Sequence, residues 1–339
     1  NAFTEDEMTE KLTNKELLAE IRRLSSLVKF YEKEELFSDR IADIVKDAVE
    51  SLPSIKPPEP HIPDTDKKEE SVLLYISDVH IGKKTKSYNP RVFVKRLNTL
   101  KENVFDIVDI HRSVRNISKL YIAFGGDVID AESVYPAQAV EHISIPIIDQ
   151  IFTVGLPEFT KFLLDCSAYF PEIECHCVRG NHGKQNAAKW TSSKSTNWDF
   201  VFYKALEAAT KGQDRIKWII PVKDWKDTFK IYNEGFLITH GDMIKRYYSS
   251  PFYGMTRQAE RWANAYRDKI KLTHFMFGHF HSLDTGMRHN RLRIYVNGSF
   301  VTDDPFAEEN IGTASVPEQL VLGVHPTKGV TWRYGLNLE

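Results

Sequence analysis

The chain has 339 residues, of which 42% are hydrophobic and 27% are charged, and this ordinary mixture predicts a folded globular protein. No apolar run approaches the roughly 20 residues that a membrane-spanning helix needs, which argues against an integral membrane protein. The first residues are acidic, unlike a secretion signal, and Cys166, Cys175 and Cys177 lack metal-finger spacing. We therefore expect a cytoplasmic protein with buried thiols and no disulfide framework.

Charge is unevenly distributed along the chain. Residues 1–70 contain 11 Lys and Arg against 18 Asp and Glu, which leaves a net charge of +5 for residues 71–339 because the whole chain carries −2. This balance favours a substrate that bears phosphate but does not identify it.

Residues 1–52 are predicted to be helical. No glycine occurs from about residue 5 to residue 52, and apolar residues in this segment recur in steps of three and four. These residues are Leu17, Ile21, Leu24, Val28 and Tyr31, followed by Phe37, Ile41, Ile44, Val45 and Val49. The pattern fits a helix or hairpin packed on its own core, and it also fits a coiled coil that mediates homo-oligomer formation or binds a protein partner.

A proline-rich segment separates this helical part from the main domain. Residues 53–70 contain five prolines among charged residues, which predicts an extended, semi-rigid linker. We expect the main domain to occupy residues 71–339.

In the main domain, short apolar runs alternate with helical stretches, a pattern that predicts an α/β fold. The predicted strands are Val72–Ile76, Leu120–Phe124, Ile173–Val178, Phe236–Thr239, His274–Phe277 and Leu292–Val296. The predicted helices are Pro90–Val108, Ile147–Ala168 and Trp198–Ala209.

Short turns rich in potential metal ligands follow most of these strands. They are Ser77-Asp78-Val79-His80, Gly125-Gly126-Asp127-Val128-Ile129-Asp130, Arg179-Gly180-Asn181-His182, Thr239-His240-Gly241-Asp242 and Gly278-His279-Phe280-His281. The carboxyl ends of strands in an α/β sheet form a crevice outside the core, so the five turns can converge on one site.

The spacing within the turns suits metal binding. Asp78 and His80 are two residues apart, so on an extended segment both side chains point the same way, and the pair His279 and His281 repeats this spacing. Glycines next to the proposed ligands allow the backbone to bend sharply or to approach a phosphate. Each turn alone is common in proteins, whereas all five in this order form a specific pattern.

These five motifs resemble those of the calcineurin-like metallophosphoesterases, namely Asp-x-His, Gly-Asp, Gly-Asn-His, a His beside Gly, and Gly-His-x-His. The resemblance covers Ser71 to about Ser282 and implies an αββα sandwich, in which two mixed sheets pack face to face with helices outside. It implies that Asp78, His80 and His281 bind one metal, that Asn181, His240 and His279 bind a second, and that Asp127 bridges both. His182 would be unligated and catalytic, beside the substrate.

One residue departs from the family pattern. Family members usually have Asp after Gly-Asn-His, where this chain has Gly183. Since that Asp commonly supports the catalytic His, a different carboxylate would have to support His182.

The resemblance implies two divalent cations, on which an activated water attacks phosphorus in line. A mixed Asp, His and Asn donor set suits borderline cations, so Mn²⁺ is the first expectation and Fe, Zn or Ni are alternatives.

Other residues near the motifs are weaker candidates. Arg179 and Asp242 could support the ligands from outside, although structural ion pairs explain them equally well. Basic residues that could contact nucleic acid, or simply be solvated, are Lys83, Lys84, Lys86, Lys184, Lys245 and Arg246.

We interpret the chain first as a nuclease that acts on DNA. The turns at residues 77–82 and 125–130 resemble SbcD-type repair nucleases and the small subunit of archaeal family D polymerase, and Asn197-Trp198-Asp199 resembles phage metallophosphoesterases. One alternative is a phosphoesterase for a small nucleotide or a phosphoprotein. Another is a non-catalytic scaffold subunit of a replication or repair complex.

Overall fold

The computed structural model describes residues 25, 40–52, 67–132, 142–184, 197–221, 224–245, 251–304 and 316–339. The chain divides into two compact units, Asn1–Ser51 and Leu52–Glu339. In the first unit, residues 40–51 form a helix within the segment that was predicted to be helical. The rest of that segment and most of the proline-rich linker lie outside the described residues.

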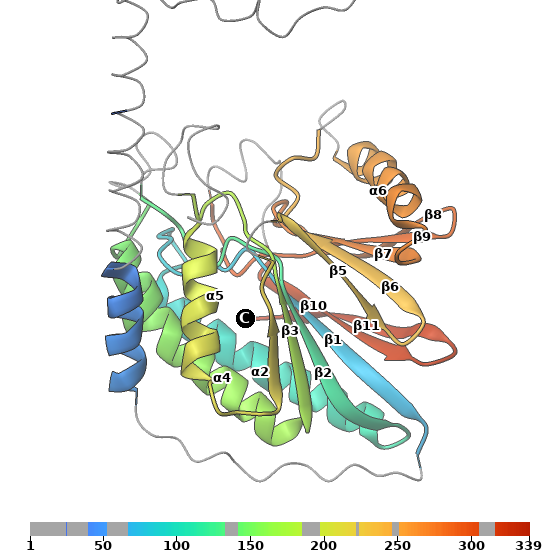
Figure 1. Cartoon of the computed structure of the whole chain (residues 1–339), viewed down its shortest axis with the longest axis horizontal. Helices are drawn as coiled ribbons and strands as arrows, with labels where there is room; N and C mark the ends of the chain where they lie inside the picture. Colours follow the sequence, from blue (N-terminus) through green and yellow to red (C-terminus); the bar gives the residue numbers. More distant parts are fainter. Residues whose placement is uncertain are drawn as a thin grey trace, which may run out of the picture. The chain divides into compact units, whose positions relative to one another are not determined.

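The second unit is built on two β-sheets (Figure 1). The first sheet has the strand order β11-β10-β1-β2-β3-β4, in which β1 to β4 are parallel and β10 and β11 are antiparallel to their neighbours. Its strands are β1 (Glu69–Ile76), β2 (Asn116–Phe124), β3 (Glu172–Cys177), β4 (Ile216–Ile219), β10 (Glu318–His325) and β11 (Gly329–Asn337).

The second sheet has the strand order β5-β6-β7-β9-β8. The pairs β6–β7 and β7–β9 are parallel, whereas the outer pairs are antiparallel. Its strands are β5 (Lys226–Ile231), β6 (Glu234–Thr239), β7 (Leu272–Phe277), β8 (Asp284–His289) and β9 (Leu292–Val296).

Helices cover the outer face of each sheet (Figure 1). On the first sheet these are α2 (Pro90–Arg112), α4 (Leu156–Tyr169), which continues the π-helical η1 (Asp149–Gly155), and α5 (Trp198–Ala209). The second sheet carries α6 (Phe252–Tyr266), which contacts β7 and β9. The start of α2 is set locally, because Asn89 accepts hydrogen bonds from the first free N–H groups of the helix and Pro90 occupies its first turn.

Two apolar cores hold these layers together. Between the sheets, Tyr75 of β1 and Phe236 of β6 belong to one fully buried cluster. Between the second sheet and α6, Trp262 packs in a cluster with Phe275 and Phe277. Almost every residue of the central strands β1 and β7 is buried, whichever face it points to, which explains why these strands are continuous apolar runs.

The arrangement confirms the predicted αββα sandwich. The six predicted strands correspond to β1, β2, β3, β6, β7 and β9, and the three predicted helices to α2, to η1 with α4, and to α5. The structure adds β4, β5, β8, β10, β11 and α6, which were not predicted. Cys166, Cys175 and Cys177 are buried free thiols, as expected. Within the described part of the chain, no helix is both long enough and apolar enough to span a membrane.

Candidate metal centre

The five predicted turns lie at the carboxyl ends of β1, β2, β3, β6 and β7, where the two sheets present their ends together. Backbone hydrogen bonds link the first two turns, because Asp78 N donates to Gly126 O at 3.1 Å and His80 N donates to Asp127 O at 3.0 Å. The main chain, and not only the side chains, therefore fixes the relative positions of the proposed ligands.

Five proposed ligand residues have left-handed backbone. They are Asp78, His80, Asp127, His279 and His281, with φ between 48° and 70°. A non-glycine residue in this region costs on the order of 1–3 kcal/mol, and such strain concentrates at functional sites. The expectation that Asp78 and His80 lie on an extended segment is therefore wrong, since the turn bends at each of them.

The first group of ligands combines Asp78, His80 and His281, whose donor atoms all lie within 4.8 Å of one another. The Nε2 atoms of His80 and His281 face each other at 3.3 Å, and His281 Nε2 lies 3.3 Å from Asp78 Oδ1. Burial lowers the pKa of His80, which favours the neutral imidazole that a metal requires. One carboxylate and two imidazoles thus point at a single position.

The second group combines Asp127, His240 and His279, also within 4.8 Å. His240 Nε2 lies 2.9 Å from Asp127 Oδ2 and 2.9 Å from Asn181 Oδ1, so the predicted amide ligand joins this group. His240 Nδ1 donates to Gly125 O at 2.9 Å, and this bond directs Nε2 toward the site.

The electrostatics of the second group call for a cation. Burial opposes a charge on His240, but the adjacent Asp127 carboxylate raises its pKa to about 10. Burial and the charge on His240 lower the pKa of His279 to about 3. The buried Asp127 carboxylate therefore favours a positive charge beside it.

Glycines allow the backbone to approach the buried carboxylates. An added Cβ on Gly180 would lie 2.0 Å from Asp127 Oδ1, and one on Gly278 would lie 2.6 Å from Asp78 Oδ2. His279 N donates to both oxygens of Asp78 at 3.0 Å, which ties the two ligand groups together. These two glycines are required by space, because any side chain would collide with a carboxylate.

His182 is held by Asp130, a contact that sequence reasoning did not identify. Nδ1 of His182 lies 2.8 Å from Asp130 Oδ1, and Asp130 is fully buried. Burial opposes the charged form of His182, but Asp130 and Asp127 raise its pKa. Asp130 thus replaces the carboxylate that is missing after Gly-Asn-His, and the available signal was its position three residues after Asp127.

The glycine at position 183 has a steric cause. An added Cβ there would lie 2.4 Å from Asn197 Oδ1. Asn197 caps α5 by accepting a hydrogen bond from Asp199 N at 2.8 Å, and its Nδ2 donates to Gly180 O at 3.0 Å. Because Asn197 fills this space, an Asp side chain at position 183 would clash.

Asp199 links the second and third turns, and its role was also missed. The buried carboxylate accepts hydrogen bonds from four backbone N–H groups, those of Asp127, Val128 and Ile129 at 3.1 Å and that of Gly180 at 2.8 Å. Burial and the Asp127 carboxylate raise the pKa of Asp199 to about 6. Asp199 thereby holds the backbone on either side of the Asp127 carboxylate.

The proposed nucleic-acid contacts are in different environments. Lys83 is buried and lies 3.3 Å from the buried Asp304, so its proposed role as a surface contact is a misassignment. Lys184 forms an ion pair with Asp242 at 3.6 Å, which makes both residues structural partners across two turns. Arg179 is partly buried beside them. The exposed candidates are Lys84, Lys86 and Lys245, and Arg246 lies outside the described residues.

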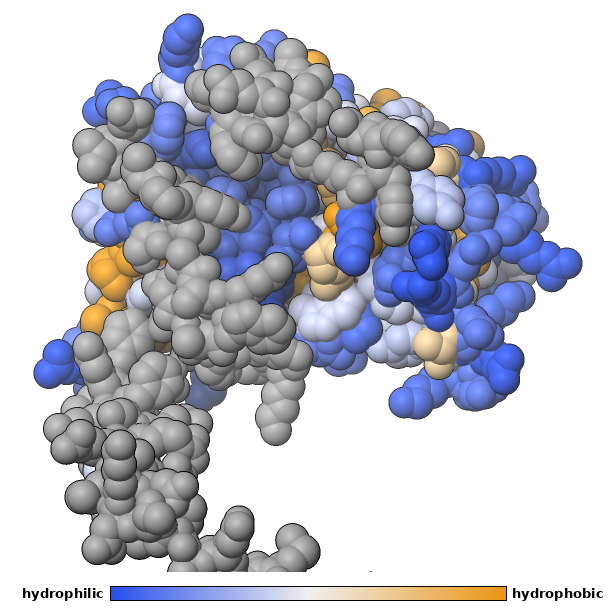
Figure 2. All heavy atoms as spheres, turned by 90° about the horizontal axis from the view of Figure 1, so that it is seen from above, coloured by the Kyte–Doolittle hydropathy of each residue, from blue (hydrophilic) through white to orange (hydrophobic). Residues whose placement is uncertain are grey.

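The donor set fits two divalent cations. It offers two buried carboxylates, four imidazoles and one amide oxygen, which is the mixture that borderline metals such as Mn²⁺ or Zn²⁺ accept. Burial opposes ionisation of Asp78, but His281 and His240 lower its pKa, so the carboxylate stays charged. Figure 2, which views the molecule from above, shows that much of the visible described surface on that face is hydrophilic.

No protein-family model matches the chain, and no curated protein matches its sequence. Solved structures to which it is similar include wild-type Vps29 from Entamoeba histolytica complexed with Zn²⁺, with 14% identity over 78% of this chain and 99% of that one, at a TM-score of 0.31. A predicted phosphoesterase from Streptococcus pneumoniae is 9% identical over 78% of this chain and 98% of its own, at a TM-score of 0.30. A 5'-nucleotidase from Candida albicans is 12% identical over 83% of this chain and 54% of its own, at a TM-score of 0.38.

All five motifs converge between the ends of two sheets in an αββα sandwich. This is the arrangement that the resemblance of the motifs to calcineurin-like metallophosphoesterases implies. Within this fold, both predicted metal sites have their donor atoms together, and the predicted catalytic histidine has a carboxylate partner.

Proposed function

We propose that this metallophosphoesterase chain hydrolyses phosphodiester bonds at a two-metal centre and that DNA is its substrate. One observation carries the proposal: two groups of three donor residues, of which all but the partly buried His279 are buried, are linked by the hydrogen bond from His279 N to Asp78. A scaffold that had lost activity would have no need to retain both groups together with the strained backbone that positions them.

Two bound cations would supply an activated water and would neutralise charge on the phosphoryl oxygens. Asp78, His80 and His281 would hold one of them. Asn181, His240 and His279 would hold the other, with Asp127 between the two groups. Mn²⁺ is the first metal to test, and Fe, Zn and Ni are the alternatives.

His182 handles the proton in this proposal. Its Nδ1 is engaged by Asp130, which leaves Nε2 as the atom that can donate to the leaving oxygen. The carboxylates of Asp130 and Asp127 raise the pKa of His182, which favours its protonated form. Asp130 thus acts through His182, which it orients.

Surface charge supports nucleic acid as the substrate. Residues 71–339 carry a net charge of +5, and Lys84, Lys86 and Lys245 are exposed beside the first and fourth motifs. Cations placed beside a metal centre attract a phosphate backbone through counterion release. A small phosphate ester would be held mainly by the metals and would depend little on these residues.

The test compares substrates under defined metal and salt conditions. Chelated protein reconstituted with Mn²⁺ should cleave linear or circular DNA and should also hydrolyse bis(p-nitrophenyl) phosphate. Added salt should reduce DNA cleavage steeply and affect the small substrate little. Rapid hydrolysis of a nucleotide or phosphoprotein with no cleavage of DNA under any metal would replace the nuclease by a small-substrate phosphoesterase. Absence of any hydrolysis would favour the scaffold.

A further inference from the structure

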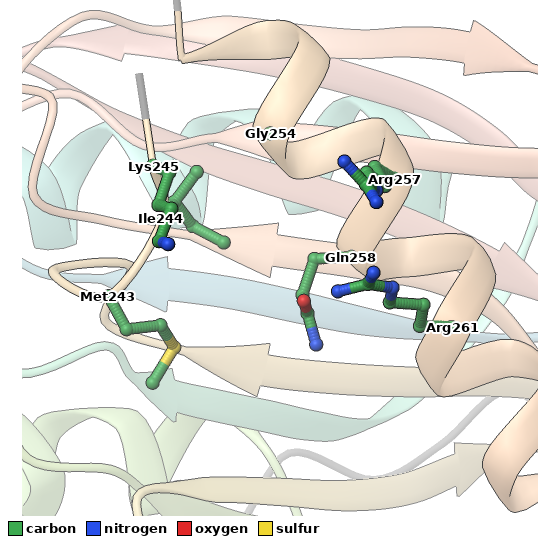
Figure 3. A pocket seen from close by; sticks show the side chains of 7 residues that line it. All are labelled: Met243, Ile244, Lys245, Gly254, Arg257, Gln258 and Arg261. Carbon is green, nitrogen blue, oxygen red and sulfur yellow. The ribbon is translucent and has the colours of Figure 1, made fainter. Parts of the chain in front are cut away.

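A basic pocket lies beside the fourth motif, outside the metal centre. It has a volume of about 280 Å³ and opens between the loop after β6 and helix α6. The lining residues are Met243, Ile244, Lys245, Gly254, Arg257, Gln258 and Arg261 (Figure 3). The pocket begins only three residues after His240, so the same loop carries a proposed metal ligand and one wall of the pocket.

Packing fixes the two walls of this pocket relative to each other. Gly254 lies directly against the loop, since an added Cβ there would be 2.2 Å from Lys245 O. Ile244 is buried in the core cluster that also contains Met255 and Trp262 of α6. The position of Lys245 next to the helix is therefore set by close packing and by the apolar core.

The cations of the pocket have no anionic partner among the residues that the structure describes. Lys245, Arg257 and Arg261 are exposed, and none of them forms an ion pair or side-chain hydrogen bond there. Arg257 and Arg261 are one helical turn apart, a spacing at which like charges destabilise a helix. Glu260 forms no ion pair with either arginine within the described part of the chain, and it accepts hydrogen bonds from His289 at 2.8 Å and Asn290 at 3.1 Å.

The side chains around the pocket define the chemistry of its ligand. Two guanidinium groups and an ammonium group suit phosphate oxygens, to which Arg can donate two parallel hydrogen bonds. Phe252 and Tyr253 begin α6 and are 41% and 58% exposed, respectively. Exposed aromatic rings next to cations are the elements that bind unpaired bases and the backbone of a single strand, whereas an acidic peptide would leave the rings unused.

We propose that this pocket binds a backbone phosphate of a nucleic-acid strand, with Phe252 and Tyr253 as stacking surfaces for its bases. The proposal rests on the proposed function in one respect, namely that the bound strand is the one cleaved at the metal centre. Lys245, Arg257 and Arg261 then select a polymeric substrate, while the metal ligands act on any accessible phosphodiester.

The experiment measures binding of a fluorescein-labelled single-stranded oligonucleotide by fluorescence anisotropy, in chelator so that no cleavage occurs. The double variant Arg257→Ala, Arg261→Ala should raise the Kd at least about tenfold, because each side chain donates charge-assisted hydrogen bonds. It should also lower the slope of log K against log salt by about 1.4, or roughly 0.7 for each phosphate contact to a single strand. With Mn²⁺ restored, hydrolysis of bis(p-nitrophenyl) phosphate should be unchanged.

The matched control is Arg267→Ala, Lys269→Ala, which removes the same charge just beyond the other end of α6, where both side chains are exposed. This control should change the Kd much less than the pocket variant. Equal effects of the two variants would overturn the pocket as a phosphate site without affecting the proposed hydrolysis.

Two further outcomes separate the pocket from the proposed function. Oligonucleotide binding that depends on Arg257 and Arg261, in a protein that hydrolyses no phosphodiester, would overturn the proposed function and leave the pocket supported. Tighter binding of a polyglutamate peptide than of the oligonucleotide at the same salt concentration would overturn nucleic acid as the ligand.

Discussion

The metal centre and the basic pocket on α6 use polar residues in opposite ways. At the metal centre most of the polar side chains are buried, and several proposed ligand residues have left-handed backbone. In the pocket the cations are exposed and have no partner among the described residues. Under the proposals above, metal binding and substrate selection place different physical demands on side chains that lie close together along the chain after β6. The ligands must be positioned before substrate arrives, whereas the cations need only be available to it.

The largest effect is expected at Asp127, the proposed bridging ligand. Asp127→Ala removes the carboxylate that contacts His240 and accepts a hydrogen bond from His182 N at 2.7 Å. Both metals should be lost, and hydrolysis of DNA and of bis(p-nitrophenyl) phosphate should fall to background. Metal content per chain and activity are measured together. A variant that remains active with one metal would contradict the two-metal model.

His182→Ala should lower turnover by roughly 10²- to 10⁴-fold, the range for a positioned acid–base group. Asp130→Asn, which keeps the shape but removes the charge facing His182, should lower turnover less. Both variants should keep their metals, because neither residue is a proposed ligand. Loss of metal from His182→Ala would show that it is a ligand.

Asp199→Asn tests whether the buried Asp199 carboxylate positions the proposed metal ligands through its hydrogen bonds to their backbone. The amide has only one acceptor oxygen for the four N–H groups that the carboxylate now satisfies. Metal affinity should fall roughly 10- to 100-fold, as for other residues that support ligands. Raising the metal concentration should restore the activity of this variant. If Asp199 contributed only to folding, added metal would not restore activity.

The surface lysines should have a smaller effect that is selective for DNA. Lys84→Ala, Lys86→Ala should lower the salt slope of DNA binding by about 1–2 and leave hydrolysis of the small substrate unchanged. Lys83→Ala provides the contrast, because it breaks the buried pair with Asp304 and should cost roughly 3–5 kcal/mol of the free energy of unfolding. Equal losses for both substrates in the double variant would place these lysines in the fold or in the site itself.

Removal of residues 1–66 should affect neither the metal centre nor the basic pocket. Strand β1 begins at Glu69, so the truncated chain keeps every described strand and helix of the sandwich. We expect unchanged hydrolysis of the small substrate and a changed oligomeric state by light scattering. A mass in solution that changes only by the deleted residues would leave this segment as a packed helix or as a contact for another protein.

The predictions from sequence succeeded where information is local. Each motif concentrates potential ligand residue types and glycine in a few positions after an apolar run, so the strands that precede the motifs, and the turns that come together at their ends, could be predicted. Asp130 and Asp199 were missed because they act on residues of other turns, across 52 and 19 positions of sequence, respectively. The partner of β1 could not be predicted either, since Tyr75 pairs with Leu320 from the far end of the chain.

The pocket shows a second reason why sequence reasoning is incomplete. Lys245 was singled out because it follows a motif, but Arg257 and Arg261 lie in a helix whose polar side looks like any solvated surface. What distinguishes them is the absence of anionic partners among the described residues and the contact of Gly254 with the loop. Both features depend on tertiary structure.

The left-handed backbone at the proposed ligand residues lowers the stability of the fold at the positions that the proposed activity requires. Glycine adopts φ of 50–70° without the steric penalty that His281 bears, so His281→Gly would relieve strain while removing a ligand. Directed evolution of this protein for heat resistance, without a screen for hydrolysis, would therefore tend to erase the metal centre. Selection in the metal-loaded state would oppose this drift, because bound cations stabilise only the folded chain that retains its ligands.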